Sequence, residues 1–202
     1  MELIDYKTQL KKFYKPASAG AEWVDVPAMN FIMIDGQGDP TNSKEYGIAV
    51  ESLFAIAFAV KILIKRIDAI EYSVMPLECL WGPDDPSLTH WDRKGDWKWT
   101  LMIQQPTPVT SKLYAKALAE AQAKAPLIIP PTLRFEALKE GRAVQALHLG
   151  PLEGFGPVVK VIRDRILSVH AKPVGKYHEI YLSDTRKATP DKWKTIIRQP
   201  YV

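Results

Sequence analysis

Two stretches of this chain repeat one another: Lys98–Pro106 (KWTLMIQQP) and Lys192–Pro200 (KWKTIIRQP). Five of the nine aligned positions are identical, namely the Lys, Trp and Ile, the second Gln and the Pro. The first stretch alternates in side-chain type, which predicts a β-strand, and each Pro predicts the end of its strand. A strand that recurs in this way predicts a duplicated structural unit, with chance similarity of short stretches as the alternative.

The segments before these two strands correspond as well. Each half opens with a short apolar run that ends at a glycine, Gly36 in the first and Gly150 in the second. Apolar residues at helical spacing then predict helices over about 44–67 and 157–170. The order is β-α-β-β twice, so we expect an α+β fold. Its tandem duplicated β-α-β-β units would form antiparallel sheets, with helices packed on one side and a central ligand groove.

The rest of the chain surrounds these two units. Residues 1–26 are polar and basic, and we expect an N-terminal arm there. A single domain then covers 27–202, with pseudo-symmetric halves at about 27–106 and 142–202. Between the halves, residues 107–141 are expected to form an inserted helix and hairpin. Pro126 would stop the inserted helix.

Composition excludes several classes of function. The chain has 202 residues, 27 Lys+Arg against 23 Asp+Glu, and one cysteine. A lone Cys79 excludes an internal disulfide and a cysteine zinc site, and the burial expected for it predicts an inert thiol. The histidines lack metal-ligand spacing, so we expect no metal and no cofactor. They are His90, His148, His170 and His178.

Charge and hydropathy bear on partners and location. The net charge of +4 is spread among alternating signs, so we expect no nucleic-acid partner. The most apolar stretch, 52–64, is about 13 residues long, which is too short to span a bilayer. The first residues lack the basic and apolar regions of a signal peptide. We therefore expect a cytoplasmic protein without a membrane partner.

The candidate catalytic residues lie on the predicted strand 177–182. Period-two alternation places Tyr177, Glu179 and Tyr181 on one face. This face lines either solvent, as on an ordinary edge strand, or a cavity. In a cavity, burial raises the pKa of Glu179 and suits it to general-base catalysis or cation binding.

A second carboxylate and several aromatic residues complete the candidate site. Glu78 lies on an apolar face, where it either makes a structural hydrogen bond or binds a ligand. Four tryptophans within 19 residues predict either core packing or an aromatic wall for a flat or cationic ligand: Trp81, Trp91, Trp97 and Trp99. The ligand-binding candidates are Trp81, Trp99, Glu78, Met102 and His148, although a structural role is the stronger interpretation for His148.

Several motifs together resemble the stand-alone GyrI-like small-molecule-binding proteins, over roughly residues 20–202. They are Asn30–Pro40, Met75–Glu78, Trp97–Trp99, His148–Pro151 and His178–Asp184. Cys79, Trp81-Gly82 and Leu152 depart from the pattern of these relatives and would reshape a pocket. The resemblance implies a tandem β-α-β-β pair with a central groove. The same fold forms the effector-binding domain of some multidrug-responsive regulators.

The resemblance also suggests a function. It places Glu179 at the floor of the pocket, with an aromatic cage at Trp81, Trp99 and Tyr181. A similar subfamily hydrolyses the cyclopropane of spirocyclopropane DNA alkylators of the yatakemycin type. Glu179 would activate water there and Tyr181 would donate to the dienone oxygen, which implies bacterial drug detoxification and resistance. Two alternatives stay open: a non-catalytic protein that sequesters a small aromatic or cationic drug, and an interaction protein that inhibits DNA gyrase.

Overall fold

The computed structural model describes residues 2–17, 20–82, 97–124, 127–151, 154–184 and 187–202. The chain divides into two compact units. The first comprises Met1–Gln9, Met29–Met75 and Lys94–Leu138, and the second comprises Leu10–Ala28, Pro76–Arg93 and Lys139–Val202. Each unit combines antiparallel strands with packed helices, which confirms the predicted α+β class.

The first unit is built on three antiparallel strands. In spatial order they are β6 (Lys98–Gln105), β3 (Met29–Gln37) and β7 (Arg134–Leu138). A separate parallel pair joins β1 (Glu2–Ile4) to β4 (Ile70–Tyr72). The short helix α1 (Tyr6–Gln9) follows β1. In β6 the seven residues after Lys98 are all buried, so this strand forms the centre of the unit's core.

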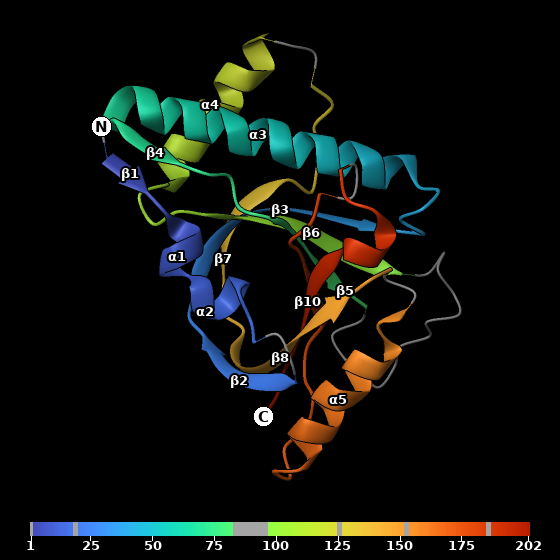
Figure 1. Ribbon diagram of the computed structural model, residues 1–202. Coiled ribbons are helices and arrows are strands. Elements are labelled where there is room, and N and C mark those ends of the chain that lie inside the picture. Colours follow the sequence, from blue (N-terminus) through green and yellow to red (C-terminus); the bar gives the residue numbers. More distant parts are fainter. Residues whose placement is uncertain (1, 18–19, 83–96, 125–126, 152–153, 185–186) are drawn as a thin grey trace. The chain divides into compact units, whose positions relative to one another are not determined.

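Two helices pack side by side in the first unit, α3 (Lys44–Asp68) and α4 (Ser111–Lys124) (Figure 1). The Ser43 hydroxyl accepts from the amide of Tyr46, so Ser43 is the N-cap of α3. Ala69 ends α3 in a left-handed conformation (φ 54°). One side of α3 packs on β3 and β6 through buried apolar residues that include Leu53, Ile56, Val60 and Ile64.

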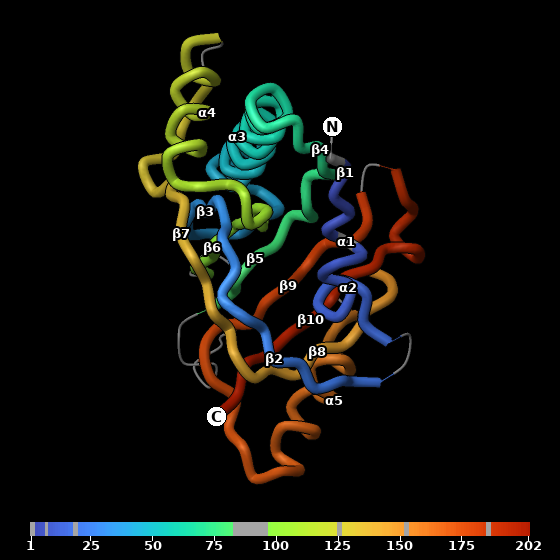
Figure 2. The backbone as a smooth tube through the Cα atoms, turned by 90° about the vertical axis from the view of Figure 1, so that its left-hand side faces the viewer, coloured from blue at the N-terminus to red at the C-terminus, as the bar shows by residue number. Residues whose placement is uncertain are grey.

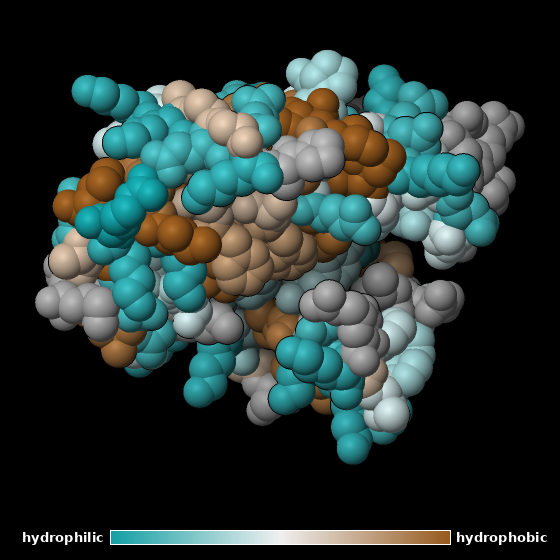
Figure 3. Space-filling view, turned by 90° about the horizontal axis from the view of Figure 1, so that it is seen from above, coloured by the Kyte–Doolittle hydropathy of each residue, from teal (hydrophilic) through white to brown (hydrophobic). Residues whose placement is uncertain are grey.

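The outer side of α3 remains partly apolar. Phe58 is 48% exposed and Ile62 is 60% exposed, beside a groove of about 260 Å³ between α3 and α4. Apolar side chains are visible among hydrophilic ones on this face of the molecule (Figure 3). The 25 residues of α3 are long and apolar enough to cross a membrane, so the length argument made for 52–64 does not hold. Its packing against strands is nevertheless that of a core helix.

The second unit contains five antiparallel strands, and Figure 2 shows β9 and β10 running side by side. In spatial order they are β2 (Ala21–Val26), β8 (Gly141–Leu149), β10 (Lys194–Pro200), β9 (Tyr177–Tyr181) and β5 (Leu77–Trp81). Ile162 and Ile166 of α5 (Gly156–Leu167) are buried where this helix packs on β8, β10 and β2. The described part of this unit also contains α2 (Lys11–Tyr14) and a 3-10 turn, η4 (Pro190–Lys192).

The N-terminal segment differs from the arm expected for 1–26. It contains β1, α1, α2 and β2, and it buries Tyr6 and Tyr14. Tyr6 packs edge-to-face on Tyr72, with ring centroids 6.1 Å apart. An aromatic ring buried in this way stabilises a segment in which Lys11, Lys12 and Lys15 are exposed, which composition alone does not indicate.

The compact units also partition the chain differently from the sequence repeat. β5 precedes the first copy of the repeated strand, yet it pairs with β9 and belongs to the second unit. The repeated glutamines both donate a side-chain hydrogen bond to a backbone carbonyl within their own unit. Gln105 donates to the carbonyl of Ile103, and Gln199 donates to that of Val174. The division into halves at 27–106 and 142–202 stays a prediction.

Candidate functional site

The antiparallel pair β5–β9 presents two faces with different chemistry. Cys79 lies opposite Glu179, and Trp81 lies opposite Tyr177. Because directly opposed residues share a face, these four side chains and Tyr181 belong to one side of the pair. Hereafter this side is called the Glu179 face, and the other is called the His178 face.

A chain of hydrogen bonds runs along the Glu179 face. The Tyr181 hydroxyl donates to Oε2 of Glu179 over 2.8 Å. The indole N–H of Trp81 points to the Tyr181 oxygen over 3.3 Å. Glu179 is only 5% exposed, so its carboxyl group has lost most of its hydration and these contacts replace only part of it. The side chains predicted to be catalytic, Glu179 and Tyr181, are therefore in direct contact.

Burial controls the protonation of Glu179. Desolvation raises the pKa of this carboxyl group, while hydrogen bonds from Tyr181 and Trp81 and the charge of His178 lower it. The resulting pKa is about 7. At neutral pH, both protonation states of Glu179 are therefore populated, which suits a general acid or base.

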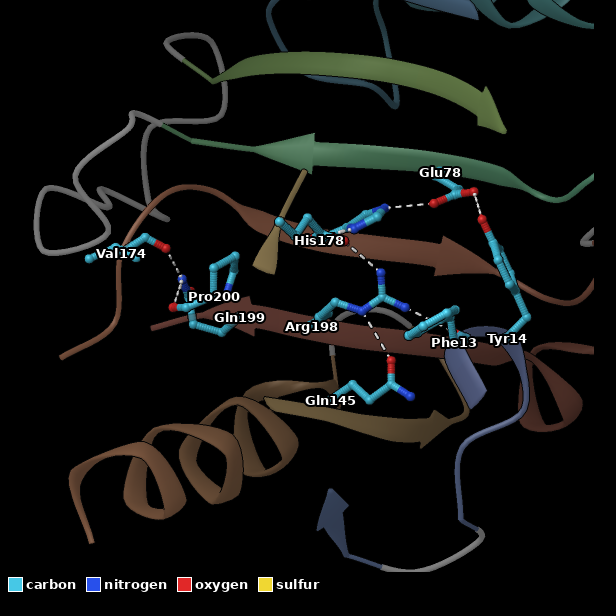
Figure 4. A network of polar contacts seen from close by, with 10 residues as sticks. Phe13, Tyr14, Glu78, Gln145, Val174, His178, Arg198, Gln199 and Pro200 are labelled. Atoms are coloured by element: carbon cyan, nitrogen blue, oxygen red, sulfur yellow. Dashed lines mark hydrogen bonds and ion pairs between the residues drawn. The ribbon is translucent and has the colours of Figure 1, made fainter. Parts of the chain in front are cut away.

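The His178 face holds a buried ionic cluster (Figure 4). Nε2 of His178 lies 2.8 Å from Oε2 of Glu78, and Nδ1 lies 2.9 Å from Oε1 of Glu140. Arg198 binds the second oxygen of Glu140 over 2.6 Å. The hydroxyl of Tyr14 donates to Oε1 of Glu78 over 2.7 Å. Two carboxylates and two cations thus neutralise one another out of contact with water.

The pKa values of the cluster follow from this pairing. Burial alone would raise the pKa of Glu140, but the charges of His178 and Arg198 lower it to about 2. Burial alone would lower the pKa of His178, but Glu140 and Glu78 raise it to about 9. The pKa of Tyr14 is raised, first by burial and then by the charge of Glu78. At neutral pH, His178 is therefore charged.

Within the cluster, the partners of Glu78 are side chains of the protein itself. Its side chain is fully buried, accepts a hydrogen bond from Tyr14 and lies at ion-pair distance from His178. This geometry favours the structural alternative that the sequence left open for Glu78. Ligand binding by this residue stays a prediction.

The other predicted ligand-binding residues lie elsewhere. Trp99 and Met102 are buried on β6, in the first unit. The Trp99 ring lies so close to Gly36 that a Cβ there would be 2.1 Å from it, which explains the glycine. Nε2 of His148 lies 2.8 Å from the carbonyl oxygen of Pro151, as a structural histidine would. Their ligand roles stay predictions.

Cys79 is fully buried, as predicted. Trp91 and Leu152 lie outside the described residues. Within the described part of the chain, no three His, Cys, Asp or Glu side chains are grouped so that they could hold a metal ion.

Sequence reasoning missed four members of the ionic cluster, because it considered His178 only among the histidines that lack metal-ligand spacing. Tyr14 lay in the expected arm, and Glu140 lay in an expected hairpin turn. Arg198 carried a signal, because it replaces Gln104 at the equivalent position of the repeat. A charged residue that replaces a polar one inside an apolar strand predicts a buried partner.

Comparisons with known proteins place the chain in a family. The profile of the GyrI-like small molecule binding domain matches residues 22–202. Crystal structures of three Listeria innocua proteins are similar: an uncharacterized conserved protein (36% identity, 98% of this chain and 100% of that one, TM-score 0.90), a hydrolase (34%, 100% and 100%, 0.88) and a further hydrolase (35%, 98% and 100%, 0.85). Comparison with curated proteins gave no match. With this extent of similarity, the chain belongs to the GyrI-like small-molecule-binding domain family.

Proposed function

We propose that this protein is a hydrolase that opens the strained cyclopropane of flat, aromatic spirocyclopropane alkylators at the Glu179 face. The observation that carries the proposal is the buried Glu179 carboxyl, with a pKa of about 7, bonded to Tyr181. Two Listeria innocua proteins at 34% and 35% identity are hydrolases, which supports hydrolysis in general. The substrate class comes from the resemblance of the sequence motifs.

The chemistry requires one proton acceptor and one proton donor. Ionised Glu179 accepts a proton from water as the water oxygen bonds to the cyclopropane CH2 carbon. The strained C–C bond breaks, and its electron pair passes into the dienone ring, which becomes a phenolate. Tyr181 donates its proton to the phenolate oxygen.

The 2.8 Å contact between Tyr181 and Glu179 then closes the cycle. Protonated Glu179 returns its proton to the tyrosine oxygen, so both residues regain their starting states. The net reaction adds one water molecule to the substrate and destroys an electrophile. A cytoplasmic location, in which the enzyme protects DNA and confers drug resistance, is part of this proposal.

The test is mass spectrometry of a spirocyclopropane cyclohexadienone alkylator incubated with purified protein. We expect a product heavier by one water with the wild-type chain, and loss of that product with Glu179→Gln. The matched control is Glu51→Gln, an exposed carboxylate on α3, which retains the activity. Product formation by Glu179→Gln at the wild-type rate would exclude Glu179 from the reaction.

A binding protein without turnover is the second candidate. The observation that favours it is that ionised Glu179 lies among aromatic groups, as a counter-charge for a cationic ligand would. Unchanged compound that co-elutes with the wild-type chain would support this candidate. The hydrolase proposal would then be abandoned for that class of compound.

A further inference from the structure

The outer side of α3 carries an apolar ridge. Phe54, Phe58 and Ile62 recur every four residues, so they follow one line along the surface of the helix. The rings of Phe54 and Phe58 lie with their centroids 6.5 Å apart. Phe58 and Ile62 are exposed although both are apolar. Burial of a large apolar side chain is favourable by about 1.5–3 kcal/mol, so covering this ridge would release free energy.

A groove of about 260 Å³ lies beside the ridge, where α3 and α4 run side by side (Figure 1). Phe58 and Ile62 line it together with four alanines, two from each helix: Ala55, Ala59, Ala117 and Ala121. Small side chains allow a further helix to approach closely. When a second copy is turned about a twofold axis, the ridge of each copy meets the groove of the other. The ridge and the groove are hereafter called the α3–α4 face.

Charged residues border the ridge at both ends. Glu51 lies seven residues before Phe58, and Lys65 lies seven residues after it. Seven residues are close to two helical turns, so both charges share the side of α3 that carries Phe58. Glu51 is exposed, and the Lys65 side chain is 46% exposed. Lys65 binds Glu71 over 2.9 Å, but its ammonium group has three donors and can bind a second carboxylate.

The order of these charges selects both the occupant of the face and its direction. In an antiparallel pair of α3 helices with Phe58 on the twofold axis, Glu51 of each copy lies opposite Lys65 of the other. The same register places Phe54 opposite Ile62, so apolar side chains meet between the two ion pairs. A parallel pair would instead place Glu51 opposite Glu51, and like charges repel. The α3–α4 face therefore matches a second copy of itself.

A lipid bilayer matches the face less well. The positions from Glu51 to Lys65 cover about 21 Å along α3. The hydrocarbon core of a bilayer is about 30 Å thick, so an α3 that spanned it would carry both charges inside. The inner side of α3 is also occupied already, because it packs on β3 and β6.

We propose that a second copy of this chain docks on the α3–α4 face, with the two α3 helices antiparallel across a twofold axis at Phe58. The ridge of each copy lies against the groove of the other, and Glu51 pairs with Lys65 at both ends. The apolar centre supplies most of the affinity, and the ion pairs at the rim fix the register. All of these residues belong to the first compact unit, whereas Glu179 belongs to the second. The inference is therefore independent of the proposed function.

The first test is the mass of the purified full chain in solution, measured by sedimentation equilibrium over a range of concentrations. We expect a species with twice the chain mass of 22.8 kDa. Phe58→Glu places two carboxylates together on the axis, so association should weaken by at least about a hundredfold. The matched control is Ile67→Glu, because Ile67 has the same exposed fraction as Phe58, 48%, but lies on the opposite side of α3. Its dissociation constant should be that of the wild-type chain.

The second test reverses the charges at the rim. Glu51→Lys and Lys65→Glu each place like charges at both ends of the interface, so each variant alone should associate about tenfold more weakly. In an equal mixture, one chain of each variant brings opposite charges together at both ends. Native mass spectrometry with one variant isotope-labelled should then detect more mixed dimer than chance pairing gives. Glu51→Gln is the control: its amide still accepts a hydrogen bond from Lys65 of the other copy, so its dimer should persist.

Three results would overturn the inference. A wild-type chain that stays monomeric up to its solubility limit has no such interface. A dimer that persists in Phe58→Glu, with its fold verified by circular dichroism, uses a different surface. A mixture of the two charge-reversed variants that shows no preference for the mixed dimer excludes the antiparallel register.

The two tests also distinguish the other occupants and guard against misfolding. If Phe58→Glu fails to fold, the mixture decides alone, because its variants change only exposed charges. A monomeric wild-type chain that floats with phosphatidylcholine vesicles, while Ile67→Glu floats and Phe58→Glu does not, would identify lipid as the occupant and would overturn the inference. Preferential formation of the mixed dimer supports the second copy as the occupant, since only contacts between chains can restore association in this way.

Discussion

His178 and Glu179 are neighbours in β9, yet their side chains experience different electrostatic surroundings. His178 lies among Glu78, Glu140 and Arg198, whose charges neutralise its own. Glu179 lies beside Trp81 and Tyr181, which donate hydrogen bonds but carry no charge. Both residues are buried. The difference shows that burial alone does not decide ionisation, because the number of compensating charges on each face does.

The His178 face should be the more sensitive to loss of one charge. Arg198→Met leaves Glu140 with His178 alone and removes a hydrogen bond to the carbonyl oxygen of Phe13. We expect a loss of about 3–5 kcal/mol in the free energy of unfolding, since breaking a buried ion pair leaves an uncompensated charge. Urea denaturation measures it. The control Lys194→Met, on an exposed residue of the same strand, should cost little. Equal costs for the two variants would contradict the comparison.

On the Glu179 face, removal of a charge should raise the free energy of unfolding. The pKa of Glu179 rises from 4.5 unfolded to about 7 folded, so the folded chain binds more protons between these values. Stability is therefore lost as the pH rises from 4.5 to 7. Glu179→Gln removes this loss and should stabilise the protein by about 3 kcal/mol near pH 8, and hardly at pH 4.5. Thermal unfolding at both pH values measures the difference, with Glu51→Gln as the control. Destabilisation near pH 8 would contradict the prediction.

A second pH window should distinguish the two faces in one experiment. The pKa of His178 rises from 6.5 unfolded to about 9 folded. Its stabilising effect is fully present below pH 6.5 and is lost as the pH rises through 9. Glu179→Gln should therefore abolish the decline of stability between pH 4.5 and 7 and keep the decline above pH 6.5. Loss of both declines in this variant would show that the two faces are not independent.

The hydrogen bond from Tyr14 on α2 to Glu78 should contribute less to the free energy of unfolding than the contacts of Arg198 do. Tyr14→Phe removes one hydrogen bond to a buried carboxylate and creates no charge. We expect a cost of about 2 kcal/mol in unfolding free energy. Tyr72→Phe is a suitable control, because it keeps the edge-to-face ring contact with Tyr6 and removes a hydroxyl that makes no hydrogen bond within the described residues. If Tyr14→Phe lowered the free energy of unfolding no more than its control, residues 10–15 would not be stabilised by the ionic cluster.

The smallest effect should come from Tyr181→Phe. The Tyr181 hydroxyl lowers the pKa of Glu179 by donating a hydrogen bond to its ionised form. Removing it should raise the Glu179 midpoint and leave the His178 midpoint unchanged. Titration by NMR of chains labelled in Glu and His side chains reports both values in one sample. A downward movement of the Glu179 midpoint would contradict the assigned direction of this hydrogen bond.

Much of the secondary structure could be predicted. Helical spacing predicted 44–67, and α3 spans Lys44–Asp68. The repeat of KWTLMIQQP located two buried strands, β6 and β10. Alternation along 177–181 placed Glu179, Tyr177 and Tyr181 on one face. These features depend on local periodicity, which can be recognised from residues that are close together in the sequence.

The ionic cluster could not be predicted in the same way. Its members lie at 14, 78, 140, 178 and 198, on five separate segments. Apart from Glu78 on an apolar face and Arg198 in place of Gln104, nothing in their neighbourhoods distinguishes them from exposed polar residues. Strand pairing brings Glu78, His178 and Arg198 together, because β9 lies between β5 and β10.

The sequence by itself determined the α+β class, the positions of the long helices, the repeated strands and a glutamate between two tyrosines. Tertiary structure decided that this glutamate contacts Tyr181 and Trp81, and that the histidine next to it carries a charge. The physical reason is range. Periodicity and capping act between residues a few positions apart, whereas a pKa depends on every charge and every lost water molecule within several ångströms, whichever segment supplies them.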